Sequence, residues 1–204
     1  MNTKSLIVSP KIPKTDKYIP ADTLQRIYDA ADKIRDLFYI MWHCETGVRI
    51  SDIVGIKRKG RERHIGQEIR NIEWDRNRIY TYDHKKDQWR YVYFPEKVRS
   101  KLKLWLKERQ NLGIKGRELF PYSEKTCGRI LKRWCKKVDF QHADKVGTHW
   151  CRHTFIRLSR RAGRDLKAVQ QNTGDSIKTI LEWYEALGPE DMFGELNKKP
   201  LIKL

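Results

Sequence analysis

The sequence of 204 residues lacks the features that mark several classes of protein. It has no apolar run long enough for a signal peptide or a membrane span, so we expect a cytoplasmic protein with no membrane partner. Its four cysteines form no C-x-x-C pair, which argues against a disulfide framework and a structural zinc site and favours reduced thiols. It has no internal repeat and no low-complexity tract. One compact domain is therefore the expectation.

Acidic residues are scarce relative to basic ones. Lysine and arginine number 44 against 26 aspartates and glutamates, which gives a formal net charge of +18 and an isoelectric point near 9.8. Such an excess favours a polyanionic partner, and nucleic acid is the first candidate because phosphate contacts release condensed counterions. A basic protein without such a partner is the alternative that charge alone leaves open.

The first part of the chain predicts an extended arm followed by helices. Residues 1–19 carry prolines and lysines without periodicity, as in an extended basic arm. After Pro20, apolar residues recur at helical spacing, at Leu24, Ile27, Ala31 and Ile34. The apolar run over residues 37–44 predicts a buried helix that ends at Gly47, and residues 49–56 predict another short helix.

The middle of the chain predicts a basic loop and then a small sheet. Aromatic and β-branched runs at 69–74, 78–83 and 89–94, separated by polar turns, fit a three-stranded antiparallel sheet. Helices are expected after Pro95, after Ser123 and from about residue 148 onward. The fold class is therefore α+β, mainly helical, with the sheet on one edge. The basic residues that we expect to contact DNA are Lys57, Arg58, Lys59, Arg61, Arg63, Lys85, Lys132 and Arg133.

Four segments carry the side chains that phosphate chemistry needs. TGVRISDI contains Arg49, HKKDQWRYVYFP has two lysines in a predicted turn, and NTGDSIKTILEWYEAL contains Tyr184. THWCRHTF places His149 and Arg152 one helical turn apart, on one face of a helix. Each segment alone also has an ordinary structural interpretation, such as solvated turn lysines or a tyrosine packed in an apolar helical stripe.

In this order, the four segments resemble the motifs of the tyrosine recombinase, or phage integrase, family. Its patterns are T-G-[LM]-R-[IL]-S-E-[LI], a β-hairpin with a lysine in its turn, H-x-L-R-H-[TS]-F-A and L-G-H-S-S-x-x-T-T-x-x-Y. The order and spacing agree, with the tyrosine 32 residues after the second arginine. The resemblance implies the tyrosine recombinase catalytic fold and a set of catalytic positions, namely Arg49, Lys86, His149, Arg152, Asp175 and Tyr184. For the turn lysine, counting back from Pro95 favours Lys86 and leaves Lys85 open.

The implied activity is site-specific recombination, in which DNA is cut and rejoined through a 3′-phosphotyrosyl intermediate without metal, ATP or another cofactor. The resemblance makes Arg49 and Arg152 donors to the non-bridging phosphate oxygens, a role that suits the planar guanidinium. His149 would add a hydrogen bond or handle the proton of Tyr184, and Lys86 would protonate the departing 5′ oxygen. The implied partners are double-stranded DNA with a specific target site and further copies of the chain, from dimer to tetramer.

One residue departs from the family pattern. Asp175 stands where the family usually has histidine, and an ionised carboxylate cannot donate a hydrogen bond and repels phosphate. Either Asp175 or Ser176 caps the helix that carries Tyr184, or the site is slow, tuned or inactive. A DNA-binding protein of the same fold that has lost cleavage is therefore one alternative, and a type IB topoisomerase-like enzyme is another.

In the family an N-terminal helical domain usually precedes the catalytic domain, whereas here catalytic-type sequence begins by about residue 18. A minimal recombinase and a fragment of a longer one both fit, and Met1 favours the former. We expect an arm at 1–19, a catalytic domain at 20–188 and a tail at 189–204 that docks on a neighbouring protomer.

Overall fold

The protein is described by a computed structural model that places residues 16–56 and 66–184, with side chains up to residue 182. Most of the predicted arm, the whole 189–204 tail and part of the predicted DNA contacts lie outside the described residues; these contacts are Lys57, Arg58, Lys59, Arg61 and Arg63. The helices run in the order α1 (Ala21–Ala30), α2 (Ile34–Thr46), α3 (Ile50–Val54), α4 (Glu96–Asn111), α5 (Glu124–Lys137), α6 (Thr148–Arg161), α7 (Leu166–Thr173) and α8 (Ile177–Tyr184).

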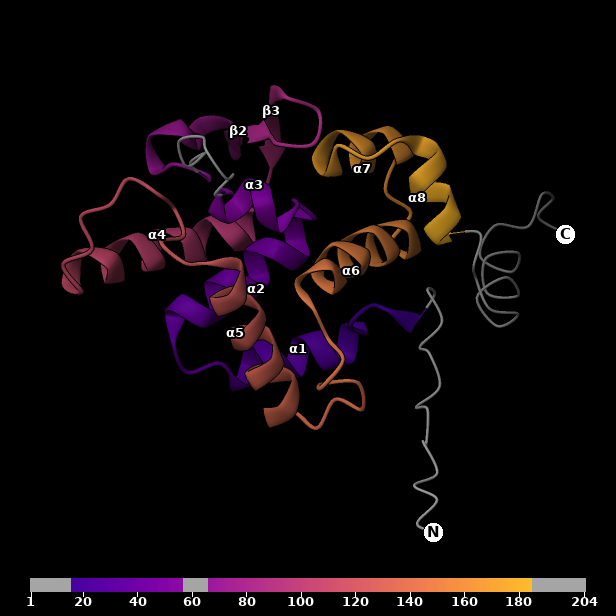
Figure 1. Ribbon diagram of the computed structural model, residues 1–204, viewed down its shortest axis with the longest axis horizontal. Coiled ribbons are helices and arrows are strands. Elements are labelled where there is room, and N and C mark those ends of the chain that lie inside the picture. Colours follow the sequence, from indigo (N-terminus) through magenta and orange to yellow (C-terminus); the bar gives the residue numbers. More distant parts are fainter. Residues whose placement is uncertain (1–15, 57–65, 185–204) are drawn as a thin grey trace, which may run out of the picture.

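Helix α2 forms the centre of the fold, because it packs against both α4 and α6 (Figure 1). Nearly all its residues are buried, which is why its sequence reads as a continuous apolar run rather than an amphipathic stripe. The helical spacing from Leu24 to Ile34 is not one helix, however. Helix α1 ends at Ala30, the backbone of Ala31 is extended, and Ile34 begins α2. No glycine or proline marks this break, so the periodicity alone hides it.

The predicted sheet is present, with one strand shorter than expected. Strands β2 (Arg78–Asp83) and β3 (Gln88–Tyr93) form an antiparallel hairpin. β1 (Ile72–Glu73) adds only two residues, between single 3-10 turns at Ile69–Asn71 and Trp74–Arg76. The structure thus confirms the predicted fold class, which is mainly helical with a small three-stranded antiparallel sheet.

The two faces of the hairpin differ sharply in chemistry. On the outer face, Tyr80 stacks on Trp89 with ring centroids 5.0 Å apart and contacts Tyr91 at 4.8 Å. The opposite face is buried and carries Ile79, Thr81 and Asp83 of β2. Because side chains alternate along a strand, this register points Asp83 at the protein interior, beside the turn of the hairpin.

A second, smaller apolar cluster fixes the last helices. Ile180 of α8 is fully buried and belongs to one cluster with Phe155 and Ile156 of α6 and Val169 of α7. Helix α8, whose last residue is Tyr184, therefore rests on the helix that carries His149 and Arg152. In Figure 1 these three helices lie together at one side of the molecule, beside the hairpin.

Candidate active site

Arg49 lies between two helices and faces two carboxylates. Helix α2 ends at Thr46, its C-cap residue Gly47 adopts a left-handed conformation with φ of 65°, and Arg49 is the N-cap residue of α3. Its Nη1 atom is 3.0 Å from Asp83 Oδ2, and its Nη2 atom is 2.7 Å from Asp175 Oδ1. Only 11% of the Arg49 side chain is exposed, so these contacts form in a partly dehydrated site.

Arg152 approaches the same place from α6. Its side chain is 5% exposed, and its Nη1 atom donates to the carbonyl of Gly47 at 2.6 Å. The Nη2 atom donates to the carbonyl of Thr173 at 2.8 Å, and Nε donates to Asp175 Oδ2 at 3.0 Å. Arg152 therefore ties together the ends of α2 and α7, and its remaining donors converge with those of Arg49.

Asp175 lies between the two arginines and does not cap α8. The cap belongs to Ser176, whose Oγ accepts from the backbone N–H of Thr179 at 3.1 Å. Each carboxylate oxygen of Asp175 contacts a different arginine, Oδ1 contacting Arg49 and Oδ2 contacting Arg152. Of the two residues that the sequence offers as the helix cap, Ser176 is the one that caps α8, and Asp175 belongs to the charged site.

Asp83 and Arg90 complete the charged cluster, and the sequence motifs do not identify either of them. Asp83 is fully buried and pairs with Arg49 and with Arg90 Nε, the latter at 3.2 Å. Arg90 also donates to main-chain carbonyls at the end of α7, including that of Asn172 at 2.8 Å. Strand alternation is the signal that finds them, because Asp83 follows Ile79 and Thr81 on the inner face and Arg90 is paired with Thr81 across the hairpin.

The carboxylates of this cluster differ in pKa. Burial acts to raise the pKa of Asp83, but the charges of Arg49 and Arg90 and the N–H groups of the following turn hold it below its usual value. Burial raises the pKa of Asp52 above its usual value, aided by the nearby charge of Asp83. Asp83 is therefore the firmly ionised partner of the two guanidinium groups.

His149 lies one helical turn before Arg152 on α6, as its spacing predicts. Partial loss of hydration, together with the charges of His43 and Arg152, lowers the pKa of His149 below its usual value. The imidazole is therefore neutral at pH 7 and has a nitrogen that can accept a proton. Burial likewise lowers the pKa of the neighbouring His153, to about 4.

Lys85 and Lys86 lie in the turn between β2 and β3, with exposed side chains. The backbone N–H of each donates to Asp83 Oδ1 at 3.1 Å. The Asp83 carboxylate, which also binds Arg49, therefore anchors this turn. The turn begins beside the site of Arg49 and Arg152. Both lysines stay candidates for the proton donor.

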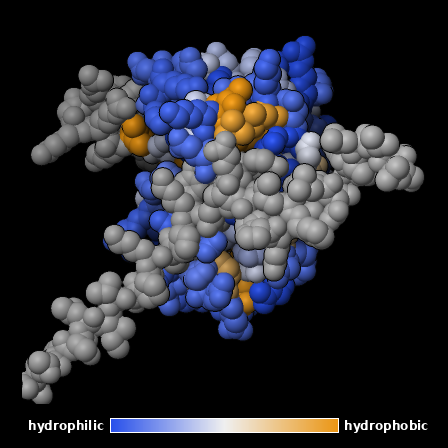
Figure 2. Space-filling view, turned by 90° about the vertical axis from the view of Figure 1, so that its right-hand side faces the viewer, coloured by the Kyte–Doolittle hydropathy of each residue, from blue (hydrophilic) through white to orange (hydrophobic). Residues whose placement is uncertain are grey.

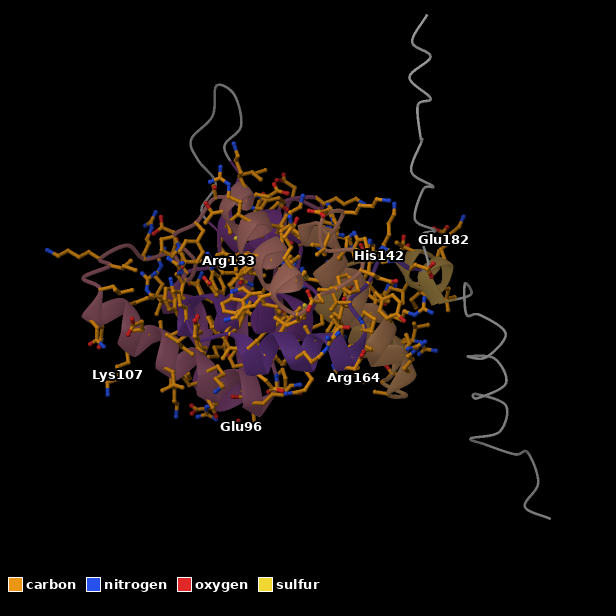
Figure 3. The ribbon with its side chains drawn as sticks, turned by 90° about the horizontal axis from the view of Figure 1, so that it is seen from below. Glu96, Lys107, Arg133, His142, Arg164 and Glu182 are labelled. Carbon is orange, nitrogen blue, oxygen red and sulfur yellow. The ribbon has the colours of Figure 1, made fainter. Side chains whose placement is uncertain are left out.

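The other predicted basic contacts lie further from the arginine pair. Lys132 is exposed on α5, and its neighbour Arg133 is labelled in Figure 3. Arg133 forms an ion pair with Asp36 in the first turn of α2. Gly47, which contacts Arg152, follows the opposite end of α2. Because a helix rises about 1.5 Å per residue, Asp36 and Gly47 are roughly 16 Å apart along the helix axis. Contact of Lys132 and Arg133 with DNA stays a prediction.

The remaining sequence expectations concern thiols, metal and membrane. All four cysteines are free and buried, as expected for reduced thiols. Within residues 16–56 and 66–184, no group of three or more histidine, cysteine or carboxylate side chains is arranged to hold a metal ion. In the same part of the chain, no helix is long and apolar enough to cross a membrane.

The chain belongs to the phage integrase family, whose sequence model matches residues 17–190. It is 25% identical over 204 residues to the tyrosine recombinase XerA of Pyrococcus furiosus, covering 96% of this chain and 66% of that protein. The chain thus spans just under two thirds of the length of this curated relative.

Solved structures share the fold. The crystal structure of XerA recombinase superposes with a TM-score of 0.74 at 23% identity, covering 93% of this chain and 66% of the other. The XerH site-specific recombinase bound to its difH substrate superposes with a TM-score of 0.66 at 20% identity, covering 94% and 56%. The fold is that of tyrosine recombinase catalytic domains.

Proposed function

We propose that this chain is the catalytic domain of a site-specific DNA recombinase that cuts and rejoins DNA through Tyr184. The observation that carries the proposal is the convergence of Arg49 and Arg152, from separate elements, on one position between α2, α6 and α7. Two guanidinium groups that share one small anion are suited to a phosphodiester, whose two non-bridging oxygens need one donor pair each. Membership of the phage integrase family supports the same conclusion.

In the proposed reaction, the Tyr184 hydroxyl attacks the scissile phosphorus. The bond between phosphorus and the 5′ oxygen breaks, the 3′ phosphate stays on Tyr184 as an ester, and the 5′ oxygen leaves as a hydroxyl. Neutral His149 accepts the tyrosine proton, and Lys86 or Lys85 donates a proton to the leaving oxygen. Attack by another 5′ hydroxyl reverses these steps and conserves the energy of the phosphodiester.

The proposed partner is double-stranded DNA with a specific target site. The net charge of +18 supports non-specific attraction to phosphates, and the coloured part of the face in Figure 2 is predominantly hydrophilic. The XerH recombinase, which shares the fold, is bound to its difH substrate in the solved structure. We propose that basic residues of this chain make equivalent backbone contacts, including Lys85, Lys132, Arg133 and the predicted loop residues Lys57, Arg58, Lys59, Arg61 and Arg63.

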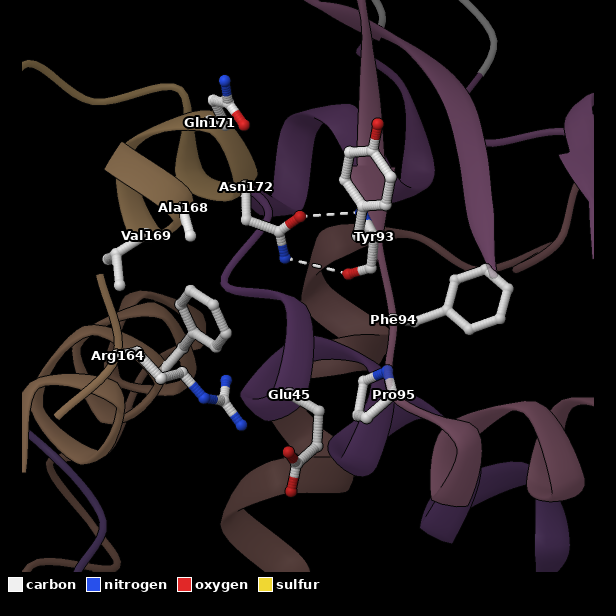
Figure 4. Close-up of a pocket in the computed structure, with 10 residues that line it drawn as sticks. Glu45, Tyr93, Phe94, Pro95, Arg164, Ala168, Val169, Gln171 and Asn172 are labelled. Atoms are coloured by element: carbon white, nitrogen blue, oxygen red, sulfur yellow. Dashed lines mark hydrogen bonds between the residues drawn. The ribbon is translucent and has the colours of Figure 1, made fainter. Parts of the chain in front are cut away.

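We also propose that the 189–204 tail docks on a neighbouring copy, at the cavity of about 380 Å³ shown in Figure 4. Phe94, Pro95 and Val169 give it apolar walls, and Arg164 and Glu45 both lie at the same cavity. The tail offers the sequence Glu-Asp-Met-Phe at 190–193, and its apolar pair fits the apolar walls. Removal of residues 189–204 should then reduce assembly on DNA from higher-order complexes to monomer complexes in native gels.

Trapping a covalent adduct tests the proposed function. The target duplex is first selected from random-sequence DNA by binding and nuclease protection, and a nick is then placed beside the protected region. Cleavage next to the nick releases a short 5′-hydroxyl fragment, which diffuses away and leaves the protein attached to DNA in denaturant. The adduct is expected with the native chain and absent with Tyr184→Phe.

Two other results would change the assignment. Specific binding without any adduct would favour a DNA-binding protein that has lost cleavage, for which the Asp175 carboxylate is the motivating observation. Relaxation of supercoiled plasmid regardless of its sequence would favour a type IB topoisomerase-like enzyme.

A further inference from the structure

The Asp175 carboxylate has the contacts that a bound phosphate would have. Its two oxygens lie 2.7 Å from Arg49 Nη2 and 3.0 Å from Arg152 Nε, one oxygen for each arginine. A carboxylate and a phosphodiester share this feature, since each presents two adjacent anionic oxygens to guanidinium donors. We call these two ion pairs the Asp175 bridge.

The Asp175 bridge also completes a balanced set of charges. The described cluster contains three guanidinium groups, of Arg49, Arg90 and Arg152, and three carboxyl groups, of Asp52, Asp83 and Asp175. Asp83 and Asp52 lie on the side of Arg90 and the hairpin, and both are fully or almost fully buried. Asp175 is the carboxylate that meets both Arg49 and Arg152, and its side chain is 11% exposed. A DNA phosphate can therefore bind this pair with full charge only after Asp175 has moved aside.

The position of Asp175 in the chain links this movement to the helix of Tyr184. Gly174, directly before it, is left-handed with φ of 71°, and Ser176, directly after it, caps α8. A Cβ atom on residue 174 would lie 2.7 Å from an oxygen of Asp83, so glycine lets this loop approach the cluster closely. The Asp175 bridge therefore lies directly before the cap of the helix that carries Tyr184.

We propose that the Asp175 bridge is an autoinhibitory contact, in which the carboxylate occupies the phosphate site until DNA displaces it. The bridge lowers the affinity of the free protein for any competing oxyanion, because both arginines already contact a carboxylate. The inference rests on the proposed function, because the displaced ligand would be the scissile phosphate. It accounts for an acidic residue at a position where an anion must bind.

Binding of tungstate, a tetrahedral oxyanion that needs no cleavage step, tests the bridge directly. Calorimetric titration should show that tungstate binds Asp175→Asn at least tenfold more tightly than it binds the native chain. The substitution removes one negative charge from a poorly hydrated site, and that charge repels the oxyanion. Asp175→Ala serves as the second variant, and circular dichroism reports whether each variant is folded. Glu182→Gln is the matched control, since it removes an exposed carboxylate from α8 and should leave tungstate affinity within twofold of native.

Rates of adduct formation on the nicked duplex separate this proposal from the proposed function. Faster adduct formation together with tighter tungstate binding in Asp175→Asn supports both. Tighter tungstate binding with no adduct from any variant supports the bridge and refutes the recombinase. Unchanged or weaker tungstate binding in folded Asp175→Asn and Asp175→Ala refutes the bridge, even where the native chain forms its adduct.

Discussion

Replacing Asp83 by asparagine should destabilise the protein more than any exposed charge change in the same turn. The carboxylate is fully buried, pairs with Arg49 at 3.0 Å and Arg90 at 3.2 Å, and accepts two backbone N–H groups. An amide of the same shape removes the negative charge and turns an NH₂ donor toward guanidinium donors. Breaking a buried pair costs about 3 to 5 kcal/mol. Because both arginines keep other acceptors here, we expect about 2 to 3 kcal/mol.

The measurement is urea unfolding followed by tryptophan fluorescence, with the free energy taken by linear extrapolation. Asp87→Asn is the control, because it makes the same chemical change at an exposed position of the same hairpin turn. It should cost less than about 0.5 kcal/mol. Equal costs for the two variants would refute the structural role assigned to Asp83.

The pH dependence gives an independent check. The pKa of Asp83 in the folded protein is below its usual value, so the unfolded chain takes up this proton first as the pH falls. The stabilisation is therefore complete above the unfolded pKa, near 3.9, and is lost as the pH falls through the folded pKa. The difference between native chain and Asp83→Asn should be full at pH 7 and should shrink below about pH 4.

Three further changes test other parts of the fold in urea unfolding. Gly47→Ala should cost about 2 to 4 kcal/mol, because the φ of residue 47 is +65° and the added Cβ would lie 2.3 Å from Phe155. A cost below about 1 kcal/mol would contradict this close packing. Asn172→Ala should cost about 2 to 3 kcal/mol, since the Asn172 amide accepts from the N–H of Tyr93 and donates to its carbonyl. An unchanged free energy of unfolding would show that these two hydrogen bonds do not stabilise the fold. His153 has a folded pKa of about 4, below the usual 6.5, so protonation of this residue in the unfolded chain should lower stability by roughly 1 kcal/mol from pH 7.5 to 5 after allowance for partial exposure. His153→Gln should reduce the fall by about that amount and leave the part due to His149, whose pKa is also lowered; an unchanged fall would contradict this.

Much of the fold follows from the sequence, because local signals and tertiary packing agree. Ser123 caps α5 through the N–H of Thr126, as its residue type predicts, and α6 begins at residue 148, where a helix was expected. The break between α1 and α2 was missed, because no residue there disfavours a helix. The short β1 was overestimated, since β-rich composition also fits the turns that flank it.

The candidate active site was likewise predicted only in part. Motif spacing predicts that Arg49 and Arg152 act together, and the structure brings them to one carboxylate. Motif spacing could not predict that this carboxylate is Asp175. Arg49 and Asp175 are 126 positions apart in the sequence, and their contact depends on how α7 ends. Asp83 and Arg90 were missed because charged residues inside a small sheet resemble solvated ones until the register is known.

The most direct test of the proposed chemistry is to locate the residue that becomes attached to DNA. The trapped adduct is digested with nuclease and trypsin, and the modified peptide is sequenced by mass spectrometry. The recombinase proposal predicts a 3′-linked nucleotide on the peptide 179–198, in which Tyr184 is the sole tyrosine. An adduct on any other peptide, or none on a duplex that the protein binds specifically, would contradict the assignment of Tyr184 as the nucleophile.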